Sequence, residues 1–126
     1  LVTRVFTDAE LADARRRRDP TEPLAARFAA KEAAMKALGV GLGAVALRDL
    51  EVVREPSGRP GIVLHGAAAQ RAQTRGVTGW LLTMSHTASA AVATALALGA
   101  GTDRPGVARP GTARAGTDRP GSARRS

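Results

Sequence analysis

The chain has 126 residues, a formal net charge of +8, no cysteine and an aromatic fraction of only 2%. This length allows one domain, and so few aromatic residues predict a thin core of small side chains that a subunit interface would supplement. The lack of cysteine excludes disulfides, thiol chemistry and Cys-rich zinc sites. No membrane span or signal peptide is expected, so the predicted location is cytoplasmic.

The charge is divided evenly between the body of the chain and its end. Residues 1–99 carry thirteen Lys or Arg and nine acids, and residues 100–126 carry six Arg and two Asp, so each part has a net charge of +4. A moderately basic body suits an acidic partner or a phosphate-bearing ligand, and it does not demand nucleic acid.

Two helices are predicted in the first third of the chain. The first follows a capping box formed by Thr7 and Glu10 and ends near Arg18. The run of arginines at 15–18 is interpreted as a solvated face, with contact to an acidic partner as the less favoured alternative. The second helix has Pro23 in its first turn and stops at Gly39, where a glycine loop over 39–43 begins.

Strands dominate the rest of the body. A strand over 46–54, a turn over 55–60 and a return strand over 61–65 precede a short helix over 67–75. Alternation then predicts a strand from Trp80 to His86 and a last strand over 91–98, with Ala at every second position on one face. That Ala face would let a helix approach closely. The expected class is α+β, a mostly antiparallel sheet packed with helices.

The end of the chain is a tandem repeat. AGTDRPGVAR at 100–109 returns as AGTDRPGSAR at 115–124. Pro and Gly at this density, with few apolar residues, cannot offset the entropy of ordering. We therefore expect a domain over residues 1–99 and a disordered tail over 100–126.

The two lysines mark a candidate site. Arg accounts for seventeen of the nineteen basic residues, yet Lys31 and Lys36 flank Glu32, the only acid between positions 23 and 48. Lys and Arg are not interchangeable at a site. Lys31 falls on the apolar stripe of its helix and must extend to solvent or find a partner. A simple i,i+4 ion pair between Glu32 and Lys36 remains an alternative to a magnesium–phosphate site.

A second candidate group is formed by Ser85, His86 and Thr87, where the strand from position 80 ends. His86 could carry a proton or bind a phosphate. A lone His at a strand end is more often a structural hydrogen-bonding residue, and that interpretation also stays open. His65 receives no role.

Together these segments resemble the 4′-phosphopantetheinyl transferases, most closely the short holo-acyl-carrier-protein synthase type. RFAAKEAAMKALG at 27–39 is similar to the family's RFAAKEAxxKALG signature. MSHT at 84–87, followed by AVA at 91–93, is similar to its SHT…AVA ending, and VFTDAE at 5–10 is similar to its FTxxE stretch. The match covers residues 1–98 in order.

The resemblance implies a Mg²⁺-dependent transfer of phosphopantetheine from coenzyme A to a serine of apo acyl carrier protein, in fatty acid biosynthesis. It implies a homotrimer with sites between subunits. Glu32 would be a metal ligand that helps to deprotonate the serine, Lys36 would hold phosphate charge, and His86, Ser85 and Thr87 would line the coenzyme site. Arg27 and the glycine loop are weaker candidates for coenzyme contacts. The resemblance thus predicts that Glu32 and His86 converge around the ion and the phosphates.

One departure from the family concerns its opening strand, of the form GxDxV, whose Asp is the other principal metal ligand. In the family a helix that helps to dock the carrier protein follows that strand. The sequence as written starts after both, and Asp8 does not replace the ligand because it belongs to the capping-box segment. The expectation is an N-terminally truncated transferase domain with little or no activity.

Two other classes of function remain as alternatives. A basic nucleic-acid-binding protein is suggested by a pI of about 11.6 and by the Arg-rich tail, but few aromatic side chains are available for base stacking. The other alternative is an inactive scaffold remnant that still forms the trimer.

Overall fold

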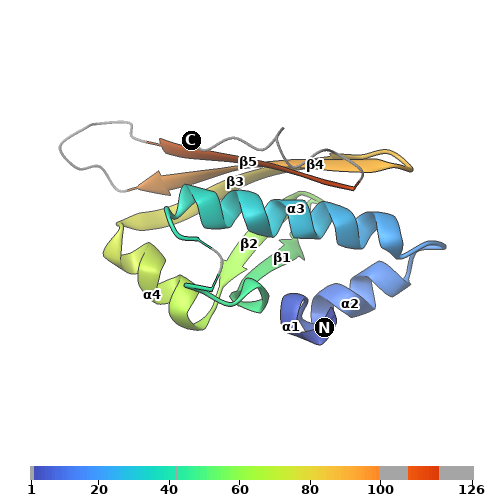
Figure 1. The fold of residues 1–126 in the computed structure, drawn as a ribbon, viewed down its shortest axis with the longest axis horizontal. Coiled ribbons are helices and arrows are strands. Elements are labelled where there is room, and N and C mark those ends of the chain that lie inside the picture. The colour runs from blue at the N-terminus through green and yellow to red at the C-terminus, as the bar shows by residue number, and fades with distance from the viewer. Residues whose placement is uncertain (1, 42, 100–107, 117–126) are drawn as a thin grey trace.

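The protein is described by a computed structural model that covers residues 2–41, 43–99 and 108–116 (Figure 1). Its elements in chain order are α1 (Val2–Val5), α2 (Asp8–Arg15), α3 (Thr21–Ala37), the 3₁₀ turn η1 (Leu47–Asp49), β1 (Leu50–Arg54), β2 (Pro60–Leu64), α4 (Gly66–Thr74), β3 (Val77–His86), β4 (Ala90–Gly99) and β5 (Ala108–Gly116). The predicted α+β class with antiparallel strands is confirmed.

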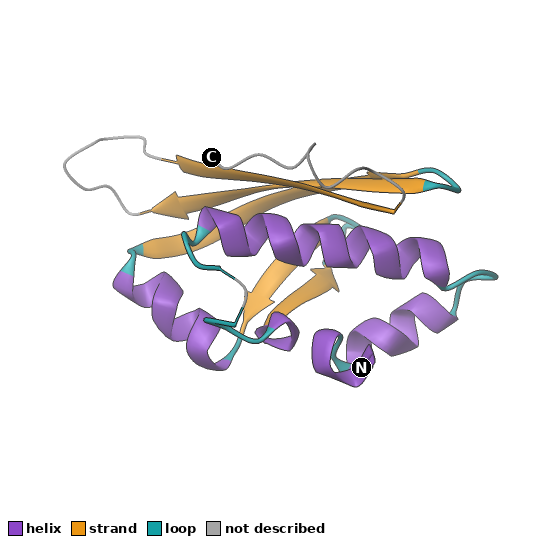
Figure 2. Ribbon diagram, viewed as in Figure 1, coloured by secondary structure: helices purple, strands orange, loops and turns teal. Residues whose placement is uncertain are grey.

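The long helix α3 lies between two layers (Figures 1 and 2). On one side is an antiparallel sheet in the order β3–β4–β5, and on the other are the β1–β2 pair and the shorter helices. Among the described elements, no helix combines the length and hydropathy needed to cross a membrane.

The contact between α3 and the sheet is built from alanine. One face of β4 presents only Ala, and these side chains are at most 3% exposed. The facing positions of α3 are also small and buried: Ala26, Ala29, Ala30, Ala33 and Ala37. Without bulky side chains between them, helix and sheet approach closely, as the alternation of the last strand predicted.

Several elements differ from the prediction. Helix α2 ends at Arg15 rather than Arg18, because the N–H groups of the next two residues bond carbonyls only three positions back and tighten the last turn. The strand expected from position 46 begins at Leu50, since η1 precedes it. Helix α1 was not predicted.

The largest difference concerns the repeat at the end of the chain. Residues 108–116 form β5, which pairs with β4 and places Gly111 opposite Ala95 and Ala113 opposite Ala93. A Cβ at Gly111 would collide with the backbone carbonyl of Ala33 in α3. The structure thus has a paired strand where disorder was expected, and the buried Gly111 and Ala113 belong to its close packing on α3. The remainder of the repeat, 100–107 and 117–126, lies outside the described residues.

Candidate active site

The imidazole of His86 lies at the end of β3, beside the first turn of α3. Its Nδ1 is 3.1 Å from Oε1 of Glu22, and both side chains are about one-third exposed, at 35% and 36%. A hollow of about 230 Å³ opens around this pair. It is also lined by Thr21, Ala25 and the turn between β3 and β4, residues 87–90. The predicted position of His86 at a strand end is correct, whereas Glu22 was missed because a first-turn acid is common in helices.

Ser85 and Thr87 flank His86 on the exposed end of the same hairpin. The Thr87 N–H donates to the carbonyl of Ala90 at 2.8 Å, which closes the turn. Thr87 therefore reaches the hollow from a fixed backbone, and Ser85 lies one residue before the imidazole on β3.

Glu32 and Lys36 lie one helical turn apart on α3. Both are half-buried, in a row that also contains Ala25 and Phe28. Burial raises the pKa of the Glu32 carboxyl above its ordinary value, and the nearby Lys36 charge lowers it only in part. A carboxylate with a raised pKa binds a proton more readily, which suits a general base.

Within one chain, Glu32 and His86 do not meet. His86 is held at Glu22, and ten residues of α3 separate Glu22 from Glu32, a rise of about 15 Å along the helix axis. Glu32 does not line the hollow around His86. A single chain thus places the two groups at different points along α3.

Arg27 is almost fully buried, with 5% of its side chain exposed. Its guanidinium forms an ion pair with Asp13 of α2 and donates to the carbonyl of Pro23 at 3.2 Å. Burial lowers the pKa of Arg27, and the Asp13 charge opposes this shift. The geometry assigns Arg27 a structural task, joining α2 to α3, and its contact with a coenzyme stays a prediction.

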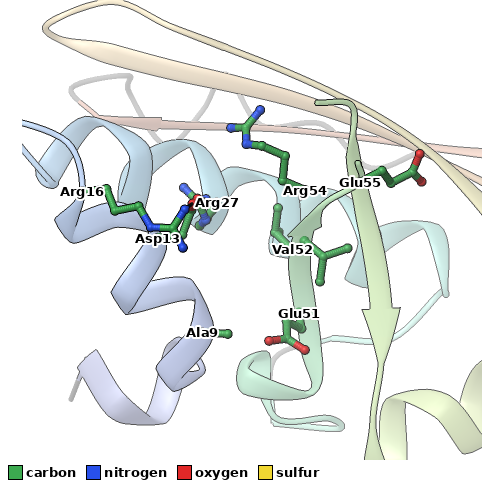
Figure 3. A pocket seen from close by; sticks show the side chains of 9 residues that line it. Ala9, Asp13, Arg16, Arg27, Glu51, Val52, Arg54 and Glu55 are labelled. Carbon is green, nitrogen blue, oxygen red and sulfur yellow. Dashed lines mark hydrogen bonds and ion pairs between the residues drawn. The ribbon is translucent and has the colours of Figure 1, made fainter. Parts of the chain in front are cut away.

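A second hollow, of about 320 Å³, lies where α2, α3 and β1 meet (Figure 3). Besides Arg27 and Asp13 it is lined by side chains of both charges, among them Arg16, Arg54, Glu51 and Glu55. Glu51 in turn accepts hydrogen bonds from Thr7 and His65, at 2.7 and 2.8 Å. Burial raises the pKa of Glu51, but these hydrogen bonds together with the charges of His65 and Lys31 outweigh it, and the pKa is lowered.

Lys31 forms a buried ion pair with Glu10, as its position on the apolar stripe of the helix requires. Its Nζ is 2.8 Å from Oε1 of Glu10, and neither side chain is exposed to solvent. The same ammonium donates to the carbonyls of Leu47 and Leu50, and it lies 5.5 Å from the centre of the Phe6 ring. Lys31 is thus part of the core, whereas Lys36 and Glu32 remain accessible.

The described residues contain no group of three or more His, Cys, Asp or Glu that could hold a metal ion. Carboxylate oxygen is nonetheless the kind of ligand that Mg²⁺ prefers. Mg²⁺ is often held by one or two carboxylates and completes its shell with water and phosphate oxygens. The half-buried carboxylate of Glu32 therefore fits an ion that arrives together with a diphosphate.

Comparison of the sequence with known proteins identifies the family of this chain. Residues 1–95 match the model of the 4′-phosphopantetheinyl transferase superfamily. The chain is 50% identical over 96 residues to a holo-[acyl-carrier-protein] synthase of Moorella thermoacetica, covering 76% of this chain and 75% of that protein. It is 48% identical over 99 residues to a synthase of the same name from Desulforudis audaxviator, covering 79% and 76%.

Solved structures agree with the sequence matches. The crystal structure of the holo-[acyl-carrier-protein] synthase from Neisseria meningitidis has a TM-score of 0.61 and 33% identity, over 68% of this chain and 70% of that one. The Helicobacter pylori synthase, crystallised with coenzyme A, has a TM-score of 0.63 and 27% identity, over 73% and 76%. This chain therefore belongs to the 4′-phosphopantetheinyl transferase superfamily, within its group of holo-[acyl-carrier-protein] synthases.

Proposed function

We propose that this chain transfers 4′-phosphopantetheine from coenzyme A to a serine of an apo acyl carrier protein, with Mg²⁺ as the metal. The names of its relatives support this reaction, and a relative crystallised with coenzyme A supports the donor. The observation that carries the proposal is the pairing of a half-buried carboxylate, Glu32, with an accessible ammonium, Lys36, one turn apart on α3.

In the proposed reaction the serine hydroxyl oxygen attacks the phosphorus that bears pantetheine. A new P–O bond forms to serine, and the bond from that phosphorus to the bridging diphosphate oxygen breaks. The leaving group is adenosine 3′,5′-bisphosphate, which takes the electron pair, and the hydroxyl proton passes to Glu32 directly or through a water molecule.

Other side chains of this chain would bind the metal and the phosphates. Mg²⁺, when bound, supplies positive charge to the diphosphate oxygens. Glu32 would hold the ion, and Lys36 would stabilise negative charge as the diphosphate bond breaks. His86 would bind phosphate oxygens beside Ser85 and Thr87, with Arg27 as a weaker contact.

A homotrimer with sites between subunits would complete this arrangement. Within one chain Glu32 and His86 are far apart, so a second copy has to supply one of them. The face of the sheet opposite α3 is available for such contacts, because no described element covers it (Figure 1). It carries Leu81, which is 43% exposed, and the half-buried Val92, Leu96 and Leu98. Self-association would bury this apolar surface.

The test is to incubate the chain with apo acyl carrier protein, coenzyme A and Mg²⁺, and to follow the mass of the carrier protein. We expect addition of one phosphopantetheine, slowly and at high Mg²⁺ concentration, because the proposed site holds the ion through one carboxylate, Glu32, and leaves the rest of its shell to water and phosphate oxygens. Glu32→Gln should slow the addition by about 100-fold or more. Asp8→Asn is the matched control, since Asp8 is 92% exposed and lies in the capping-box segment.

The outcomes are distinct. Rapid addition at low Mg²⁺ would contradict the expected weak activity and leave the reaction intact. No addition by the wild-type chain at any Mg²⁺ concentration would overturn the proposed function.

A further inference from the structure

The buried ion pair between Glu10 and Lys31 connects three elements of the fold. The Lys31 ammonium has three N–H groups, and it meets three acceptors: Glu10 Oε1 at 2.8 Å, the Leu47 carbonyl at 3.0 Å and the Leu50 carbonyl at 2.8 Å. A compact ammonium can donate in these three directions from one point, whereas the flat guanidinium of Arg cannot. This geometry accounts for a Lys at position 31 in a chain whose basic residues are otherwise almost all Arg.

Glu10 uses both carboxylate oxygens as well. Oε1 accepts from the Thr7 N–H at 2.9 Å, in addition to Lys31, and Oε2 accepts from the Val52 N–H at 2.8 Å. The pair therefore bonds the backbone of β1 at Leu50 and Val52, and it links β1 to both α2 and α3. Every charge in this buried group is compensated, which is the condition for a stable buried pair.

We propose that Glu10 and Lys31 are positioning residues for Glu32, the metal ligand of the proposed function on which this inference rests. Successive residues of an α-helix are rotated by about 100°. Three hydrogen bonds fix the Lys31 side chain toward the core, so α3 cannot rotate about its own axis. The neighbouring Glu32 carboxylate is therefore held on the half-buried row beside Lys36.

The alternative is that the pair only stabilises the fold. The two roles can be separated, because replacing a buried ion pair by neutral side chains of similar volume is often neutral or stabilising. The double variant Glu10→Gln/Lys31→Met keeps the volumes, and the Gln oxygen can still accept from the Val52 N–H. It removes the bonds from position 31 to the β1 backbone.

The experiment measures Mn²⁺ affinity in the presence of coenzyme A by electron paramagnetic resonance, together with the urea midpoint of each variant. We expect about 10- to 100-fold weaker Mn²⁺ binding in the double variant, the usual effect of losing a group that orients a metal ligand. The single variant Lys31→Arg should also bind Mn²⁺ more weakly than the wild type, because the flat guanidinium cannot reproduce the three hydrogen bonds of the ammonium. Val45→Ala, which removes volume from a buried side chain that is not a hydrogen-bond partner of Glu10 or Lys31, should lower the urea midpoint and leave Mn²⁺ binding unchanged.

A double variant that binds Mn²⁺ as the wild type does would overturn the positioning role and leave the proposed transfer standing. Weaker binding that merely follows the urea midpoint, and that Val45→Ala reproduces, would also overturn it. If the wild-type chain binds no Mn²⁺ with coenzyme A, this inference and the metal dependence of the proposed function both fail.

Discussion

Burial raises the pKa of the Glu32 carboxyl, and this shift predicts how the free energy of unfolding changes with pH. A carboxyl whose pKa is higher in the folded state favours folding most below its unfolded pKa, near 4.5, and this contribution is lost as the pH rises through the folded value. At neutral pH the ionised Glu32 therefore opposes folding. Glu32→Gln should be at least as stable as the wild type at pH 7, while its transfer rate falls by about 100-fold or more.

Urea unfolding of both proteins between pH 3.5 and 8 checks this prediction. The difference between their unfolding free energies should shrink as the pH falls below 4.5, because both side chains are then uncharged. A variant that is clearly less stable than the wild type at pH 7 would show that the Glu32 carboxylate supports the fold.

Lys31 shows how much the sequence could predict at the scale of a single residue. Its position on an apolar stripe required a partner, and that requirement was met. The partner could not be named, because Glu10 lies 21 positions earlier and its capping-box role already explained it. The capping box does form, and the same carboxylate serves the cap, the ion pair and β1.

At the scale of elements, β5 depends on one glycine. Gly111 is buried, and a side chain there would meet the backbone of α3 at Ala33. Gly111→Val should therefore push β5 away from α3 and lower the free energy of unfolding by about 1–3 kcal/mol, as overpacking does. The measurement is the urea midpoint. The matched control is Gly79→Val in β3, where a Cβ has open space.

A Gly111→Val protein as stable as the wild type would mean that β5 adds little to the fold in solution. The disorder expected for this segment would then describe it better than a paired strand.

The comparison of β4 with β5 explains why one strand was predictable and the other was not. β4 combines an Ala face with a face of Val, Thr and Leu, and this alternation is a strong strand signal. β5 contains Arg, Pro and Gly in a repeat, which by composition indicates disorder. Its pairing depends on a neighbouring strand edge and on the close approach to α3, and both are tertiary features.

At the scale of the whole molecule, the sequence identified the family, whereas the arrangement of the candidate site residues could not be predicted from it. The segments around Glu32 and His86 are recognisable because each is local. Their relative position depends on the length of α3, which holds His86 at its first turn and Glu32 about 15 Å further on. A single chain does not bring the two groups together, so the proposed shared site requires a second copy of the chain.

An assembly with sites between subunits predicts complementation between two inactive variants. One variant is Glu32→Gln and the other is His86→Ala, and the two chains are mixed in equal amounts. Random trimers of the two then contain sites that take Glu32 from one subunit and His86 from another. About one quarter of all sites would then be intact, since each group is wild type with a probability of one half. Refolding the variants together should restore about that fraction of wild-type transfer activity.

Glu32→Gln mixed with Lys36→Ala is the control, because both groups lie on the same α3 and no intact α3 exists in that mixture. Equal activity in the two mixtures, or none in either beside an active wild type, would contradict a site shared between subunits.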